Sequence, residues 1–210
     1  MKTKILLPTG LILLLFFSAC QKDPIKNLKG DETLVYITNR DSTANFSSYS
    51  TFSIADSVAV ISNNSFVKRE RTDLDAALIN AVVSNMQQRG YTLQPVHAGA
   101  DVGITISRIY NDYSRVINYG DYWGDYGGYW DPYYWGYPGY SYYYPNFYGV
   151  YTVTDGAVEV DMFDLKNAQS NNNQLKYLWN GMIRGTGTFS PGMAASSVSA
   201  LFSQSSYISK

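Results

Sequence analysis

Apolar and polar positions along the chain predict one amphipathic helix among many short extended segments. Between Thr72 and Arg89, apolar residues recur at intervals of three and four positions, which is the spacing of a helix with one buried face. Thr72 or Asp73 can cap the first turn with a side-chain oxygen, and Gly90 suits the left-handed position after a helix end. The pattern therefore predicts a helix over residues 72–89 that packs one face against a core.

The other apolar segments are short, and they alternate or are rich in β-branched residues, which is typical of strands. The strands are expected at residues 33–38, 58–61, 91–95, 102–108, 150–153, 157–165 and 176–184. Residues 46–54 are expected to be extended with their aromatic rings toward the core, and residues 62–71 to form a polar loop. The dipeptide Asp155-Gly156 favours a tight hairpin. A weaker second helix is expected after Pro191, with an apolar side formed by Val198, Leu201 and Phe202.

This order of elements predicts an α+β fold, a largely antiparallel β-sheet with one or two helices packed on one face. Strands that follow one another directly dominate the order, and helices are few. A segment rich in Tyr and Gly, residues 119–148, interrupts the strands as an insert. The second face of the sheet is expected to be either solvated or partly covered by this aromatic insert.

The aromatic insert contains 12 Tyr, 3 Trp and 1 Phe within residues 119–148, and no Lys or Arg. Because Tyr and Trp offer large amphipathic surfaces and are enriched in binding hot spots, one interpretation is an interaction surface. Its candidate binding residues are Tyr122, Trp123, Tyr126, Tyr129, Trp130, Tyr133, Tyr134, Trp135 and Tyr137. The partners of such a surface would be other proteins, glycans or the membrane interface. The alternatives are a loose surface loop and internal packing across the sheet.

Charge and residue counts exclude several kinds of function. The formal net charge is −1 with no basic block, so the chain lacks the cationic surface that binding of nucleic acid requires. A single Cys and a single His exclude a disulfide framework and metal sites built from several cysteines or histidines. Asp121, Asp125 and Asp131 do not match the spacing of a known calcium loop. No metal or other cofactor is therefore expected.

Residues 1–19 resemble a lipoprotein signal peptide. A short basic start precedes an apolar stretch that is too short to span a membrane, and Phe17-Ser18-Ala19-Cys20 resembles a lipobox. The resemblance implies cleavage before Cys20, lipidation of its sulfur and anchoring through several acyl chains. Residues 20–32 would then form a flexible tether and residues 33–206 a single α+β domain. No Asp follows Cys20 directly, so the inner-membrane retention signal of enteric bacteria is missing. This favours the outer membrane, with the domain facing the periplasm or the cell surface.

Acid–base catalysis by strand carboxylates is an alternative function. Glu159 and Asp161 lie two positions apart and so share one face of a predicted strand, for which a polar strand face is the simpler interpretation. His97 lies in a loop and Cys20 is committed to lipid, so no pair of nucleophile and base is found. The chain is therefore expected to be non-catalytic, with a glycan- or peptide-directed hydrolase as the alternative.

Several short motifs follow one another in a characteristic order. They are Phe-Ser-x-Tyr-x-Thr-Phe at residues 46–52, Arg89-Gly90-Tyr91, Ala100-Asp101, Gly156 with Val160-Asp161 and Asp164, and Leu178-Trp179-Asn180-Gly181. This order resembles a family of bacterial lipoproteins catalogued as Domain of Unknown Function 4136, over roughly residues 33–205. The resemblance implies an envelope location and this fold, and it brings no assigned reaction or catalytic residues. The sequence as a whole predicts a membrane-anchored envelope lipoprotein that serves as a binding or structural module through its Tyr-rich insert.

Overall fold

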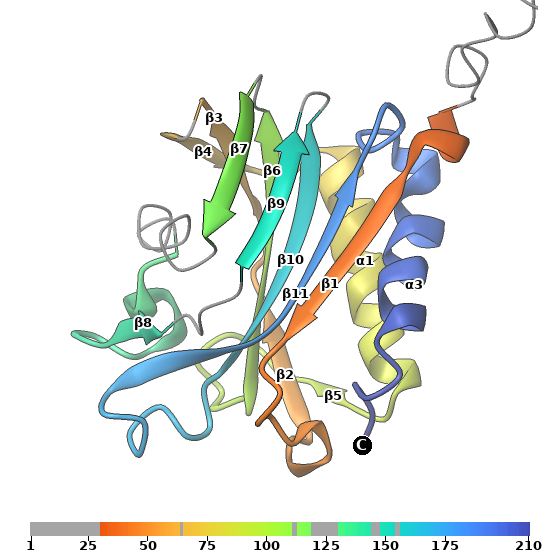
Figure 1. Cartoon of the computed structure of the whole chain (residues 1–210). Helices are drawn as coiled ribbons and strands as arrows, with labels where there is room; N and C mark the ends of the chain where they lie inside the picture. The colour runs from red at the N-terminus through yellow and green to blue at the C-terminus, as the bar shows by residue number, and fades with distance from the viewer. Residues whose placement is uncertain (1–29, 64, 111–112, 119–129, 144–147, 154–155) are drawn as a thin grey trace, which may run out of the picture.

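Two helices pack on one face of a mixed β-sheet (Figure 1). The computed structural model describes residues 30–63, 65–110, 113–118, 130–143, 148–153 and 156–210. The strands are β1 (Val35–Arg40), β2 (Thr51–Ile54), β3 (Val58–Ser62), β4 (Ser65–Glu70), β5 (Thr92–Leu93), β6 (Val102–Tyr110), β7 (Tyr113–Asn118), β8 (Ser141–Tyr143), β9 (Tyr148–Val153), β10 (Ala157–Asp164) and β11 (Gln174–Arg184). The helices are α1 (Asp73–Gln88) and α3 (Ala194–Gln204), and the short 3-10 turns are η2 (Gly30–Thr33), η3 (Phe46–Ser48), η5 (Pro132–Trp135) and η6 (Pro191–Met193).

Nine of the described strands form one sheet. The order is β1-β11-β10-β6-β2-β5, with β3 also paired to β6, β4 to β3 and β8 to β11. The long strands β1, β11, β10 and β6 are antiparallel neighbours, whereas β2 and β3 pair in parallel with β6, and β8 pairs in parallel with β11. The predicted α+β fold is confirmed, with an antiparallel centre and parallel pairs around it. β7 and β9 form a separate antiparallel ribbon, which runs in front of β6 and β10 in the view of Figure 1.

The predicted amphipathic helix is confirmed as α1, and its start is capped as expected. The Thr72 hydroxyl accepts a hydrogen bond from the Asp75 backbone N–H (3.4 Å), and the Asp75 carboxylate accepts one from the Thr72 N–H (2.7 Å). This reciprocal capping box satisfies two backbone donors that the helix itself leaves unpaired. After the end of the helix, Gly90 takes a left-handed conformation with φ of 91°. No described helix is long and apolar enough to cross a membrane.

The main core lies between the two helices and the sheet. The second predicted helix is confirmed as α3, and its expected apolar side is fully buried there: Val198, Leu201 and Phe202. Trp179 of β11 lies beneath α3, with its ring 5.5 Å from that of Phe202, and its indole N–H donates to the Ser205 hydroxyl at 2.9 Å. A Cβ at Gly181 would come within 2.4 Å of the Trp179 ring, so this packing requires glycine in the Leu178-Trp179-Asn180-Gly181 motif.

Three local predictions are wrong. Residues 62–71 are not a loop throughout, because they contain the edge strand β4, which pairs with β3 and exposes most of its side chains. Residues 46–54 are not extended throughout, since they begin with the turn η3, although their aromatic rings are buried as predicted. The hairpin at Asp155-Gly156 does not form, because β9 pairs with β7 while β10 already has β6 and β11 as neighbours. Asp155 itself lies outside the described residues.

Candidate functional site

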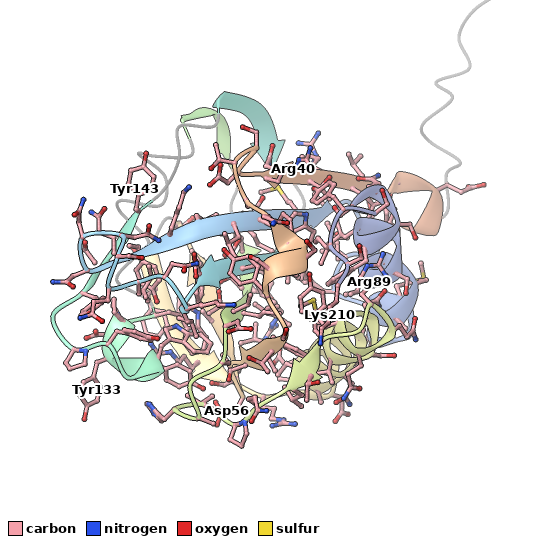
Figure 2. All side chains as sticks on the ribbon, turned by 90° about the horizontal axis from the view of Figure 1, so that it is seen from below. Arg40, Asp56, Arg89, Tyr133, Tyr143 and Lys210 are labelled. Atoms are coloured by element: carbon pink, nitrogen blue, oxygen red, sulfur yellow. The ribbon has the colours of Figure 1, made fainter. Side chains whose placement is uncertain are left out.

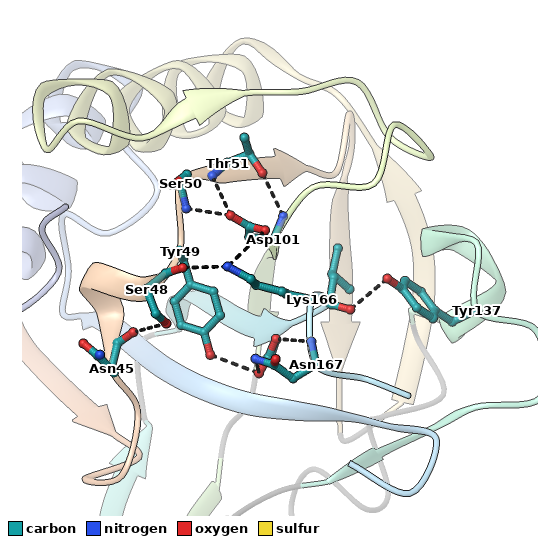
Figure 3. A network of polar contacts seen from close by, with 11 residues as sticks. Asn45, Ser48, Tyr49, Ser50, Thr51, Asp101, Tyr137, Lys166 and Asn167 are labelled. Atoms are coloured by element: carbon teal, nitrogen blue, oxygen red, sulfur yellow. Dashed lines mark hydrogen bonds and ion pairs between the residues drawn. The ribbon is translucent and has the colours of Figure 1, made fainter. Parts of the chain in front are cut away.

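Three of the sequence motifs meet in one polar network at the ends of β2, β6 and β10 (Figure 3). The Asp101 carboxylate accepts hydrogen bonds from the backbone N–H groups of Ser50 (2.6 Å) and Thr51 (3.2 Å), and the Asp101 N–H donates to the Thr51 hydroxyl at 2.9 Å. The Tyr49 hydroxyl donates to the Asp164 carboxylate at 3.0 Å. Burial, followed by the charge of Asp164, raises the pKa of Tyr49, which therefore remains a donor. These motif residues fasten strand ends to one another, which is a structural role.

The aromatic insert is joined to the same network. The Tyr137 hydroxyl donates to the backbone carbonyl of Leu165 at 2.8 Å, as Figure 3 shows. The neighbouring Lys166 ammonium donates to the carbonyl of Ser48 at 2.7 Å and lies 3.9 Å from the Asp101 carboxylate. The described part of the insert is thus held to the domain by a hydrogen bond from Tyr137 at the point where β10 ends.

The strand face that carries Glu159 and Asp161 is polar, but it is buried and does not face solvent. Val158, Val160 and Met162 point into the helix-side core, so the two carboxyl groups between them lie on the opposite face of the sheet. Their exposed fractions are 0% and 2%. The side-chain amide of Asn180 on β11 donates to Glu159 Oε1 at 2.6 Å and to Asp161 Oδ1 at 2.7 Å, so it bridges the two acids. Thr105 and Ser107 of β6 lie opposite them in register and are also buried.

The two acids favour their neutral forms. Burial, and then the charge of Asp161, raises the pKa of Glu159 well above its usual value, while the hydrogen bond from Asn180 acts against this shift. Burial likewise raises the pKa of Asp161 to about 7, against hydrogen bonds from Tyr177 and Asn180. No Lys or Arg among the described residues forms an ion pair with either carboxyl group. A raised pKa is a property of general acids. Because both carboxyl groups are buried, however, they are not accessible to a substrate in this structure.

The described part of the insert builds its own small core against the sheet. Trp130 and Trp135 are buried there with Phe163, and the rings of Trp135 and Phe163 lie 5.5 Å apart in an edge-to-face arrangement. Tyr142 packs edge-on against Phe163 from β8, at 5.3 Å. The guanidinium of Arg69 lies 4.5 Å above the Trp130 ring. Such contacts between aromatic rings and with a cation each add to the stability gained from burial.

The structure divides the candidate binding residues into three groups. Those outside the described residues are Tyr122, Trp123, Tyr126 and Tyr129, and the lipidation candidate Cys20 also lies outside them. Trp130 and Trp135 are buried, while Tyr134 and Tyr137 are half-buried with their hydroxyls bonded to the domain, Tyr134 to Asp56 at 3.3 Å. Tyr133 in the turn η5 is 68% exposed. Among the described candidates, Tyr133 is therefore the residue that presents its ring to solvent.

A solvent-open pocket lies beside the end of the insert. Its volume is about 290 Å³, and it is lined by Tyr143, Ser170, Asn171, Asn172, Gln174 and Lys176. The parallel pairing of β8 with the start of β11 brings Tyr143 opposite Lys176, and the loop before β11 supplies the asparagines. Tyr143 is 46% exposed, and Figure 2 shows that it lies on the same side of the molecule as Tyr133.

Sequence reasoning missed this pocket because its residues are far apart along the chain. The polar composition of residues 167–173 predicts only a loop, and the β8–β11 pairing carries no signal in the sequence. The sequence shows only that the polar loop at residues 167–173 and the Tyr-rich insert belong to the same domain, which does not reveal that they share a pocket. Within the described ranges no three His, Cys, Asp or Glu residues lie close enough to hold a metal ion. Asp131 caps η5 by accepting from the Tyr133 N–H at 2.9 Å, whereas Asp121 and Asp125 lie outside those ranges.

Comparison with known proteins identifies the fold and a family. The family described as "Domain of unknown function (DUF4136)" matches residues 37–205. A crystal structure of a DUF4136 family protein from Bacteroides thetaiotaomicron VPI-5482 is similar, with a TM-score of 0.69 and 27% sequence identity; the match covers 85% of this chain and 99% of that chain. Among curated proteins no match is found.

Two further solved structures share less of the arrangement. A PDZ domain protein from Parabacteroides distasonis ATCC 8503 has a TM-score of 0.46 and 11% identity, over 83% of this chain and 36% of that chain. A PelC dodecamer from Paraburkholderia phytofirmans has a TM-score of 0.40 and 8% identity, over 84% of this chain and 99% of that chain.

Proposed function

This chain belongs to the DUF4136 family, and from that premise we propose that it is an outer-membrane lipoprotein whose domain is a non-catalytic binding module. The aromatic insert would be the contact surface. One observation carries the proposal: Tyr133 is 68% exposed within a turn whose neighbouring rings, Trp130 and Trp135, are buried and fixed. An envelope protein or a glycan would pack against this exposed ring.

The fixed surroundings of Tyr133 favour binding. Because the turn that carries Tyr133 is already ordered, little conformational entropy is lost when its ring contacts a partner, so more of the contact energy contributes to affinity. Tyrosine adds apolar ring area and a hydroxyl that can donate or accept a hydrogen bond. Buried Trp130 and Trp135 serve this surface indirectly, because they hold η5 on the sheet.

The lipid anchor of the proposal rests on the sequence. Phe17-Ser18-Ala19-Cys20 resembles a lipobox, and Cys20 is the only cysteine of the chain. Metabolic labelling with a palmitate analogue should therefore label the wild-type chain and leave Cys20→Ala unlabelled. Equal labelling of the two proteins would contradict the anchor.

The alternative function is a glycan- or peptide-directed hydrolase that uses Glu159 or Asp161 as its acid or base. The raised pKa values of the pair favour this alternative, and the exposed fractions of 0% and 2% weigh against it. If the chain turns over a glycan or peptide, Asp161→Asn should abolish that turnover. A turnover that survives the substitution would exclude Asp161 from the chemistry.

The contact surface can be tested in the living cell by photo-crosslinking. A photoreactive amino acid placed at Tyr133 should give discrete adducts with envelope components. The matched control is Ser203, which is also exposed but lies on α3, on the helix side of the sheet. Adducts of equal yield and identity at both positions would show that contact at Tyr133 is non-specific and would overturn the proposed surface.

A further inference from the structure

We propose that the pocket lined by Tyr143, Ser170, Asn171, Asn172, Gln174 and Lys176 binds a neutral oligosaccharide. The inference rests on the proposed function, since it names a ligand class for the surface at the end of the aromatic insert. The volume of about 290 Å³ is near the lower end of the ~300–1,000 Å³ typical of small-ligand pockets. This size suits a short stretch of a sugar chain better than a large apolar cofactor.

The polar groups of the pocket match the chemistry of a polyol. A side-chain amide both donates and accepts hydrogen bonds, and so does each hydroxyl of a sugar. Within the described part of the chain, the side-chain amides of Asn171, Asn172 and Gln174 have no hydrogen-bond partner, so these side chains are available to a ligand. Ser170, by contrast, uses its hydroxyl to donate to the Asn167 carbonyl at 2.9 Å.

Tyr143 supplies an apolar surface at the edge of these amides. It is 46% exposed at the end of β8, where the chain pairs with Lys176 of β11. The faces of many sugar rings carry C–H groups and are less polar than their edges, so they can pack on an aromatic ring while the hydroxyls face amides. The pocket combines both kinds of surface within one small volume.

The charge of the pocket favours a neutral ligand over an anionic one. Among the described residues that line the pocket, Lys176 is the only charged one, and its ammonium lies 2.5 Å from the Asp41 carboxylate and donates to the Thr43 hydroxyl at 3.1 Å. Burial acts to raise the pKa of Asp41, but hydrogen bonds from Lys176 and Thr43 outweigh it and lower the pKa. Asp41 therefore stays ionised at neutral pH and compensates the charge of Lys176, which leaves little attraction for an anion.

The pocket loop is held in shape by its own backbone. The Asn171 N–H donates to the Asn167 carbonyl at 2.9 Å, and the Gln174 N–H donates to the Asn171 carbonyl at 3.1 Å. The Ser141 N–H donates to the Asn173 carbonyl at 3.2 Å, which links the loop to β8. Because these bonds already order the loop, binding of a ligand would cost little additional conformational entropy.

The test measures binding of defined sugars to the full chain carrying Cys20→Ala, by calorimetry and by NMR perturbation. The probes are neutral hexasaccharides of glucose, xylose, mannose and N-acetylglucosamine, with hexagalacturonate as the anionic comparator. At least one neutral probe should bind, and Tyr143→Ala should weaken that binding at least tenfold. Tyr143→Phe, which keeps the ring, should retain most of it.

The loop offers a matched pair of variants. Asn172 and Asn173 both have left-handed backbone conformations, with φ of 55° and 60°, so glycine fits either position without strain. Only Asn172 lines the pocket. Asn172→Gly should therefore weaken binding severalfold, while Asn173→Gly should bind as the wild type does.

Several outcomes would overturn the inference. They are failure of every neutral probe to bind, tighter binding of hexagalacturonate than of any neutral probe, and equal effects of the two glycine variants. Crosslinking at Tyr133 and labelling at Cys20 are read out separately. If crosslinking and labelling succeed while no neutral sugar binds, only the proposed ligand class is wrong. If a neutral sugar binds while crosslinking or labelling fails, the proposed contact surface or the lipid anchor is wrong.

Discussion

Buried acidic side chains are stabilised in different ways on the two faces of the sheet. On the helix side, Asp75 is fully buried, but the Arg108 guanidinium lies 2.8 Å from its carboxylate, and Glu70 also contacts Arg108. On the other side, Glu159 and Asp161 are buried with a neutral amide, Asn180, as their shared donor. An ion pair lets charges stay ionised inside a protein, whereas unpaired acids persist mainly by remaining protonated. The second face should therefore respond to pH in a way that the first does not.

The largest expected effect comes from opening the helix-side core. Trp179→Ala removes a fully buried ring that packs on Phe202 and donates to Ser205. The free energy of unfolding should fall by about 3–5 kcal/mol, which is typical of a large aromatic residue truncated in a core. Chemical denaturation measures it, and a loss below about 1 kcal/mol would show that the helices are not held chiefly by this core.

A smaller effect, of opposite sign at neutral pH, is expected on the other face. The folded protein holds the proton of Asp161 up to a pKa of about 7, whereas an unfolded chain releases it near pH 3.9. Between these two pH values the folded state binds more protons than the unfolded state, so the contribution of Asp161 to stability falls as pH rises, by at most about 1.4 kcal/mol per pH unit. Asp161→Asn should therefore be more stable than the wild type at pH 7.5, by about 1–3 kcal/mol.

The control for this prediction is the pH dependence itself. At pH 4, where Asp161 is protonated in the folded wild type, the stabilising effect of Asp161→Asn should nearly vanish. Asp41 and Glu70 have lowered pKa values, so they destabilise the fold as pH falls, but they do so equally in both proteins. A difference between variant and wild type that is constant from pH 4 to 7.5 would contradict a neutral acid pair.

The smallest effect is expected at the cap of α1. Thr72→Ala removes the hydroxyl that accepts from the Asp75 N–H, and the free energy of unfolding should fall by about 1 kcal/mol. Thr72→Ser keeps the hydroxyl and should restore nearly all of it. If both variants lose the same stability, the methyl group and not the cap is responsible.

The same contrast between the faces explains what could be predicted from the sequence. The helix side follows local rules, since spacing, capping and Gly90 are all readable within residues 72–90, and α1 forms as expected. The strand β4 escaped prediction because its side chains are mostly exposed, so its backbone pairing with β3 leaves no apolar alternation.

The candidate sites were harder to predict, because burial and proximity depend on distant segments. Glu159 and Asp161 have the alternation of a polar strand face, and nothing near them in the sequence shows that this face is covered. Trp130 and Tyr133 are three residues apart in the same aromatic insert, yet one ring is buried and the other exposed. Local composition could locate the insert, whereas only the tertiary arrangement separates the packing rings from the exposed ring.

The length of β11 sets a distance between the two ends of the domain. Its last residue, Arg184, pairs with Val35 next to the turn η2 where the described chain begins, and its first residue, Gln174, lines the saccharide pocket. The eleven residues of β11 span ten steps of about 3.3 Å, so these two ends lie at most about 33 Å apart. If Cys20 is anchored as proposed, the strand acts as a spacer that carries the pocket away from the lipid headgroups. A long sugar chain could then bind in the pocket without steric overlap with the membrane surface.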